Sequence, residues 1–299
     1  MSTEILWTGW SGAQLDPGAG VWVSPEVNPG FPFDELVASW NVATPPGSWV
    51  EVAARVVAES GERSGWLVLA RWSSDPAFVS TSVAGQDDPV AVAADDTILG
   101  RDGHRFTAFS LRLSLHGPTA SLPRASLLGA MVSADARDSE PAEETAWVDY
   151  ETPDPQVPFT VREVYDESFG GAGNWAFNTA YVGARGLVAY VTRLRSFAEA
   201  ARFVEAGIPL VLAVSHQEGE LTGAGYVTNG HLLVLTGFGE DGDPVVHDPA
   251  SHRIVSDAAV RTTYDLGELD RAWARSGRIV YVIRPPDVAP PEPPAQPNW

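Results

Sequence analysis

Residues 230–238, GHLLVLTGF, and the segment that follows them decide the fold class of the second half of this chain. These residues predict a strand, and the near-continuous apolar run of residues 208–214 predicts a central strand beside it. Glu240-Asp241-Gly242 predicts a turn, and residues 244–248 predict the returning antiparallel strand. The pattern around this hairpin predicts helices at 175–184, 197–206 and 266–275, and strands at 187–194, 208–214 and 278–283. Helices mixed with an antiparallel meander make this half α+β.

The same hairpin carries the candidate catalytic pair, His231 and Asp248. With a hairpin loop of two or four residues, position 248 pairs with residue 235 or 233, so Asp248 and His231 project from the same face. The four-residue loop leaves one diagonal step between them, about 7–8 Å between Cα atoms. A β-bulge reverses that result. A carboxylate that holds one ring nitrogen orients a histidine as a base, whereas the structural alternative is a partly buried histidine beside a turn.

The first 132 residues have a different pattern, with seven of the eleven tryptophans and short alternating runs. In residues 105–115, RFTAFSLRLSL, apolar and polar side chains alternate, which is typical of a half-buried strand. Turn-forming Pro-Gly, Asp-Asp-Pro and Asp-Gly sequences separate such runs. We therefore predict an all-β sandwich of jelly-roll type over 1–132. An acidic Pro/Ala linker is expected over 133–158, an α+β domain over 159–284 and an extended, disordered Pro-rich tail over 285–299.

Composition and charge exclude several classes of function. The 299 residues contain 19 Lys+Arg, all arginine, and 39 Asp+Glu, for a formal net charge of −20. Such acidity disfavours nucleic-acid and membrane-surface partners. The sequence has neither a membrane-spanning run nor a signal peptide at its start, so we expect a cytoplasmic protein. It contains no cysteine, and the spacing of its histidines predicts no metal site; no cofactor is expected.

Six stretches, in order along the chain, resemble motifs of the bacterial peptidase C39-like family. They are VYD at 164–166, GNWAFNTAY at 173–181, AGIPL at 206–210, GHLLV at 230–234, HDPA at 247–250 and AWARSGRIVY at 272–281. The resemblance covers about residues 147–283 and implies a papain-like fold with a Cys-His-Asp site. His231 and Asp248 match the family's histidine and its acidic orienter. The tryptophan-rich front half is similar to the β-sandwich that precedes this domain in relatives.

One part of the family pattern has no counterpart here. The family's nucleophile lies in a WCSPTS helix start, after a Ser-Gln pair that supplies an oxyanion donor. Both are expected between the sandwich and residues 147–150, where this chain has only the acidic linker. A papain-like site needs a thiolate at a helix N-terminus, and Ser215, the nearest hydroxyl, ends a different strand. We therefore predict an incomplete C39-type domain, inactive as a cysteine peptidase, with apolar surface exposed where the helix is missing.

Two other functions remain open. A non-cysteine hydrolase would use the His231–Asp248 pair as a general base. A glycan or cell-wall binding protein would act through tryptophans of the sandwich, with Trp7, Trp10 and Trp22 as the better exposed candidates. Trp66 and Trp72 differ by an even number and are expected to share the buried face. A peptide or protein ligand is compatible with the family resemblance, and the oligomeric state is open.

Overall fold

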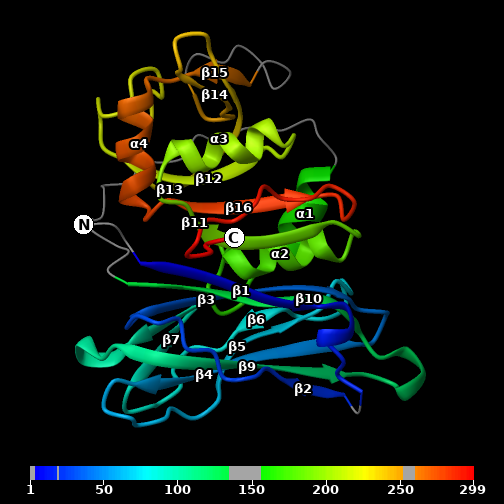
Figure 1. The fold of residues 1–299 in the computed structure, drawn as a ribbon. Helices are drawn as coiled ribbons and strands as arrows, with labels where there is room; N and C mark the ends of the chain where they lie inside the picture. The colour runs from blue at the N-terminus through cyan, green and yellow to red at the C-terminus, as the bar shows by residue number, and fades with distance from the viewer. Residues whose placement is uncertain (1–3, 19, 135–155, 252–259) are drawn as a thin grey trace.

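The computed structural model describes residues 4–18, 20–134, 156–251 and 260–299, and it has an α+β architecture in two stacked units (Figure 1). The N-terminal unit is all-β apart from short 3-10 turns, as predicted. Two antiparallel five-stranded sheets form it. In spatial order, the first sheet contains β1 (Ile5–Ser11), β10 (Arg124–Ser133), β3 (Glu35–Ala43), β8 (Thr97–Gly100) and β7 (Ala91–Ala94). The second contains β2 (Val21–Val23), β9 (Phe106–His116), β4 (Trp49–Ala58), β5 (Leu67–Trp72) and β6 (Thr81–Ser82).

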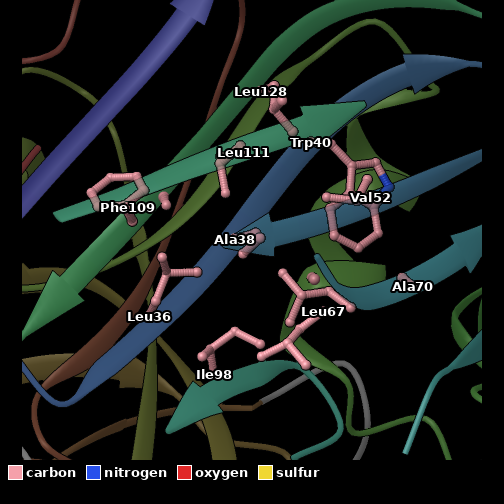
Figure 2. Packing of buried hydrophobic residues seen from close by; sticks show 14 of the residues in the cluster. Leu36, Ala38, Trp40, Val52, Leu67, Ala70, Ile98, Phe109, Leu111 and Leu128 are labelled. Atoms are coloured by element: carbon pink, nitrogen blue, oxygen red, sulfur yellow. The ribbon is translucent and has the colours of Figure 1, made fainter. Parts of the chain in front are cut away.

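Alternation along these strands builds one apolar core between the two sheets. Leu36 and Trp40 from the first sheet meet Val52 and Leu111 from the second, and all four are fully buried (Figure 2). Burial of a large apolar side chain stabilises the fold by about 1.5–3 kcal/mol relative to leaving it exposed. The period-two pattern of the sequence therefore has its expected structural cause, because every second residue of β3 and β4 contributes to this core.

Within the described residues, the C-terminal unit has one antiparallel six-stranded sheet and four helices. In spatial order its strands are β11 (Val188–Arg193), β16 (Ile279–Arg284), β12 (Leu210–His216), β13 (Thr228–Phe238), β14 (Pro244–His247) and β15 (Arg261–Thr263). Its helices are α1 (Gln156–Val164), α2 (Trp175–Gly183), α3 (Phe197–Glu205) and α4 (Leu266–Arg275). The predicted meander is the run β12-β13-β14-β15. Among the described residues, no helix is long and apolar enough to cross a membrane.

The two faces of this sheet pack against different parts of the protein. On one face, α3 and α4 pack over a core that includes Leu212, Leu233 and Val280. The other face contributes Val191 to a cluster with Val37 of the sandwich, and Figure 1 shows the sandwich directly beneath it. The sandwich therefore covers this face at β11, whereas Leu232 of β13, on the same face, remains 38% exposed.

Helix α2 joins the two units. It begins at the predicted N-cap, where the Asn174 side chain accepts a hydrogen bond of 3.1 Å from the Phe177 N–H. Ala176, Phe177 and Ala180 belong to the core of the sandwich, and the Phe177 ring meets the edge of the Trp40 ring at 6.2 Å. The helix thus closes the sandwich beside β3.

The linker predicted over 133–158 lies almost wholly outside the described residues, and α1 begins before the predicted boundary at 159. The expectation of a disordered tail over 285–299 is wrong. The segment has neither helix nor strand, as its prolines require, but Asn298 and Trp299 are buried on the protein. Side-chain contacts, which a composition argument does not consider, hold this segment in place.

Candidate functional site

Strand β13 places His231 near one end of the six-stranded sheet. His231 pairs with Val214 of β12, so its side chain projects from the same face as Leu212 and Leu233. That face is the one under α3 and α4, and the histidine side chain retains only 10% exposure. The position of His231 in the strand therefore places its imidazole on this side of the sheet, where it is largely buried.

Strand β14 brings Asp248 to the same face by a route that differs from the predicted one. The hairpin loop has five residues, since Phe238 pairs with Pro244. An odd loop alone would place Asp248 opposite residue 234 and on the wrong face. A bulge at Thr236 shifts the register by one, so Leu235 pairs with Val246 and position 248 follows opposite Leu233. The assumed loop length was therefore wrong, and the bulge restores the predicted parity.

His231 and Asp248 are in hydrogen-bond contact, as predicted. The Nε2 atom of His231 lies 2.9 Å from Oδ1 of the fully buried Asp248. Tyr226 and Tyr264 donate their hydroxyls to Oδ2 at 2.9 and 2.7 Å. The Ala250 N–H donates to Oδ1 at 3.0 Å. Two donors on each oxygen fix the carboxylate and, through it, the imidazole.

The electrostatics of this cluster keep the carboxylate charged. Burial by itself raises the pKa of Asp248, but hydrogen bonds from His231, Tyr264 and the Ala250 N–H outweigh it and hold that pKa below its ordinary value. Burial and the neighbouring carboxylate raise the pKa of Tyr226, so its phenol stays protonated and donates. An ionised Asp248 accepts the Nε2 proton of His231, which leaves Nδ1 as the basic nitrogen.

A second histidine lies behind Tyr226. The ring of His216 is 4.9 Å from that of Tyr226, which is 5.0 Å from that of His231, both in edge-on arrangements. Burial lowers the pKa of His216 and the nearby His231 lowers it further, so His216 is neutral. Its Nε2 is buried without a hydrogen-bond partner among the described residues. His216 therefore packs against the site and does not share the Asp248 carboxylate.

A cysteine thiolate cannot serve as the nucleophile beside His231. The chain contains no cysteine. The Ser215 hydroxyl is buried and donates its proton to the Thr228 carbonyl at 3.1 Å, so it is engaged in a structural hydrogen bond. No group of three or more potential metal ligands occurs in the described residues, which do not include His252.

Of the three tryptophans proposed for glycan binding, Trp10 is buried, whereas Trp7 and Trp22 are half-buried. Trp7 stacks on Tyr190 of the C-terminal unit with ring centroids 4.5 Å apart, and Trp10 is buried against Trp22. Trp66, expected to be buried, is half-buried and lies beside the Arg55 and Arg112 guanidinium groups, while Trp72 is fully buried.

A bulge is the physical reason for this correction. Val52 pairs with Ala70 and Ala53 with Val68, so Leu69 is an extra residue in β5. The even spacing of positions 66 and 72 consequently leads to opposite faces.

Sequence reasoning found the histidine and the aspartate but missed both tyrosines. Tyr226 comes from the loop before β13, and Tyr264 directly follows the three-residue strand β15. Neither lies in a periodic run or a motif quoted above. Long-range packing alone brings their hydroxyls to Asp248.

Comparison with known proteins divides the chain at nearly the same point as the fold. Residues 12–133 match the peptidase C39 N-terminal domain, and residues 140–281 match the Peptidase_C39 like family. No curated protein matches the chain. A chain of the infectious bursal disease virus Gt strain structure shares 10% identity over 44% of this chain. This chain covers 32% of that one, with a TM-score of 0.24, and so low a likeness carries no argument.

Proposed function

The chain belongs to the peptidase C39-like family, with that family's N-terminal domain in front, and from this premise we propose that it binds a peptide or protein ligand without hydrolysing it. The C-terminal unit is assigned a papain-like arrangement and the N-terminal unit a jelly-roll arrangement. His231 and Asp248 take the places of the family's histidine and acidic orienter.

The proposal rests on one combination of observations: His231 and Asp248 are joined by a hydrogen bond, and the chain contains no cysteine. A papain-like mechanism needs a thiolate beside the imidazole, because an unactivated hydroxyl ionises far less readily at neutral pH. Orientation of His231 by Asp248 supplies a base but no attacking atom. The Ser215 hydroxyl, held by the Thr228 carbonyl, is unsuited to that role.

The test is turnover of a mixed panel of peptides and esters, with His231→Ala as the control protein. No turnover above the control is expected from the wild-type chain. Ser215→Ala serves as a matched variant for hydroxyl chemistry. Turnover that disappears in His231→Ala would contradict the proposal, and turnover that also disappears in Ser215→Ala would identify a serine mechanism. Binding of panel peptides that weakens in His231→Ala supports the ligand-binding role.

A second candidate is glycan binding through the sandwich, and Trp66 favours it. The indole lies on the outward side of the second sheet, 4.7 Å from the Arg55 guanidinium carbon and 5.0 Å from that of Arg112. An aromatic ring beside cationic donors suits a sugar that carries carboxylate groups. Nearby, Glu51 is paired with Arg71 and Arg112.

This candidate is tested by titrating the whole chain with neutral and acidic polysaccharides while tryptophan fluorescence is followed. Acidic polysaccharides are expected to change the signal of the wild type and not that of Trp66→Ala. Trp22→Ala is the matched control, since Trp22 packs on Trp10 beneath the same sheet. No response of the wild type across the panel would exclude the candidate.

A further inference from the structure

The end of the described chain occupies a groove between α3, β11 and β1. Asn298 has no exposed surface and Trp299 only 7%. The Pro297 carbonyl accepts a 3.1 Å hydrogen bond from the Trp7 N–H of β1. This segment therefore touches both units, and Figure 1 shows it in red between them.

Both polar atoms of the Asn298 side chain make hydrogen bonds. Its Oδ1 accepts from Nη1 of Arg195 at 2.7 Å. Its Nδ2 donates to the Arg193 carbonyl at 2.8 Å and to Oε2 of Glu199 at 2.9 Å. The Thr192 hydroxyl donates to the backbone carbonyl of Asn298. One acceptor and two donors in this geometry fit an amide, whereas an aspartate would face Glu199 and a carbonyl oxygen.

Trp299 supplies the apolar part of the contact. Its ring meets that of Phe203 edge-on at 5.1 Å, and the Arg202 guanidinium lies 5.2 Å from it. Its Nε1 donates to the Pro291 carbonyl at 2.8 Å, which folds the proline-rich segment back over the indole. Buried aromatic anchors flanked by satisfied polar contacts are characteristic of specific binding sites.

We propose that this groove is a recognition site for an extended Pro-Asn-Trp segment, filled here by residues 297–299 of the same chain. The segment acts as an intramolecular ligand, and a separate peptide of the same sequence competes for the groove. The inference does not depend on the proposed function, because no residue of the His231 site takes part. Proline limits the conformations of the free segment and so reduces the entropy lost on binding.

The experiment uses the full chain with Asn298→Asp, which weakens the resident segment through charge repulsion at Glu199. A fluorescent peptide of residues 290–299 is titrated by anisotropy. We expect binding to the variant at least about tenfold tighter than to the wild type, whose tethered segment is present at millimolar effective concentration. The same peptide with the Asn298→Asp change is not expected to bind. Ala295→Ser, at an exposed position, is the matched control protein and should behave as wild type.

Hydrogen exchange of the full chain is the second measurement. In Asn298→Asp, amides of β1 and β11 are expected to exchange faster than in the wild type. Unchanged exchange, or equal binding of both peptides, would overturn the proposal. So would faster exchange without peptide binding up to about 1 mM, the range of the tethered concentration. If Asn298→Asp does not fold, Trp299→Ala replaces it, with the same outcomes for the same peptide.

Discussion

The buried ion pair between Arg193 and Glu35 links the two units, and its removal is the sharpest test of how they depend on each other. Arg193 lies on β11 and Glu35 on β3, with 0% and 3% side-chain exposure. Arg193 Nη2 donates to Glu35, which also accepts the Ser133 hydroxyl at 3.0 Å. Arg193 Nη1 donates to the Gly277 carbonyl. Both members of the buried pair are therefore held by further hydrogen bonds to their neighbours.

Arg193→Met leaves the Glu35 carboxylate buried without its cation. Loss of one partner of a buried pair costs about 3–5 kcal/mol. That is about a third of the stability of an ordinary protein. With an unfolding entropy of about 2.1 cal/mol/K per residue, the corresponding fall in melting temperature is about 5–8 °C for a chain of 299 residues. The combined Arg193→Met and Glu35→Leu variant removes both charges and should recover most of the loss. About 1–3 kcal/mol should remain, because the Gly277 carbonyl loses its donor.

Urea unfolding followed by tryptophan fluorescence measures these free energies. Both units contain buried tryptophans, Trp40 and Trp273, so uncoupling of the units would appear as two transitions. The matched control is Arg63→Met, which breaks the exposed Arg63–Glu26 pair and should leave the midpoint unchanged. The reasoning fails if Arg193→Met changes stability by less than about 1 kcal/mol, or if the two single losses simply add in the double variant.

Three further variants test packing and the site. Gly183→Ala should destabilise the chain although alanine favours helices, because its Cβ would lie 2.5 Å from Cβ of Asn41; a thermal melt should show a lower midpoint. Gly267→Ala in α4 is the matched control and should change the midpoint far less, because its Cβ would lie 3.3 Å from the nearest atom, Oδ1 of the capping Asp265. Asp248→Asn should make the free energy of unfolding depend less on pH in the acid range. The folded pKa of Asp248 lies below its unfolded value of about 3.9, so its contribution is present above that pH and is lost as pH falls towards the folded pKa. Urea midpoints between pH 6 and pH 3 that run parallel for variant and wild type would contradict this. Tyr264→Phe should cost about 1–3 kcal/mol in urea unfolding because it removes a hydrogen bond to a buried carboxylate, and a loss near zero would mean that this bond does not hold Asp248.

Periodicity and capping signals predicted most elements of the C-terminal unit. The helix expected over 266–275 is α4, and the strand expected over 230–238 is contained in β13. Local sequence carries such information because caps and apolar repeats act within one or two turns of chain. Helix α1, within and beyond the predicted linker, was missed because the acidic and proline-rich composition there masks its short apolar pattern.

Side-chain facing was harder to predict, because it depends on bulges that have no clear sequence signal. The bulge at Leu69 turns Trp66 outward, against the even-spacing argument. The bulge at Thr236 corrects an odd hairpin loop and brings Asp248 back to the face of His231. A one-residue shift reverses every side chain beyond it. The placement of His231 and Asp248 on one face was therefore predicted correctly by an argument that assumed an even loop and no bulge, and the errors in these two assumptions cancelled.

The edge of β11 explains why the N-terminal unit is part of the scaffold and not a separate module. An unpaired strand edge invites association with another chain. Here side chains of β3 fill that edge: Asn41 bonds both the N–H and the carbonyl of Ala189, at 3.0 and 2.8 Å, and the Ser39 hydroxyl accepts the Val191 N–H at 2.9 Å. These polar residues alternate with the inward-facing core residues of β3. A single strand therefore supplies apolar side chains to the sandwich core and hydrogen bonds to the backbone of β11. A role for the sandwich in ligand binding must therefore use its opposite sheet, where Trp66 lies, because the first sheet is committed to holding the C39-like domain.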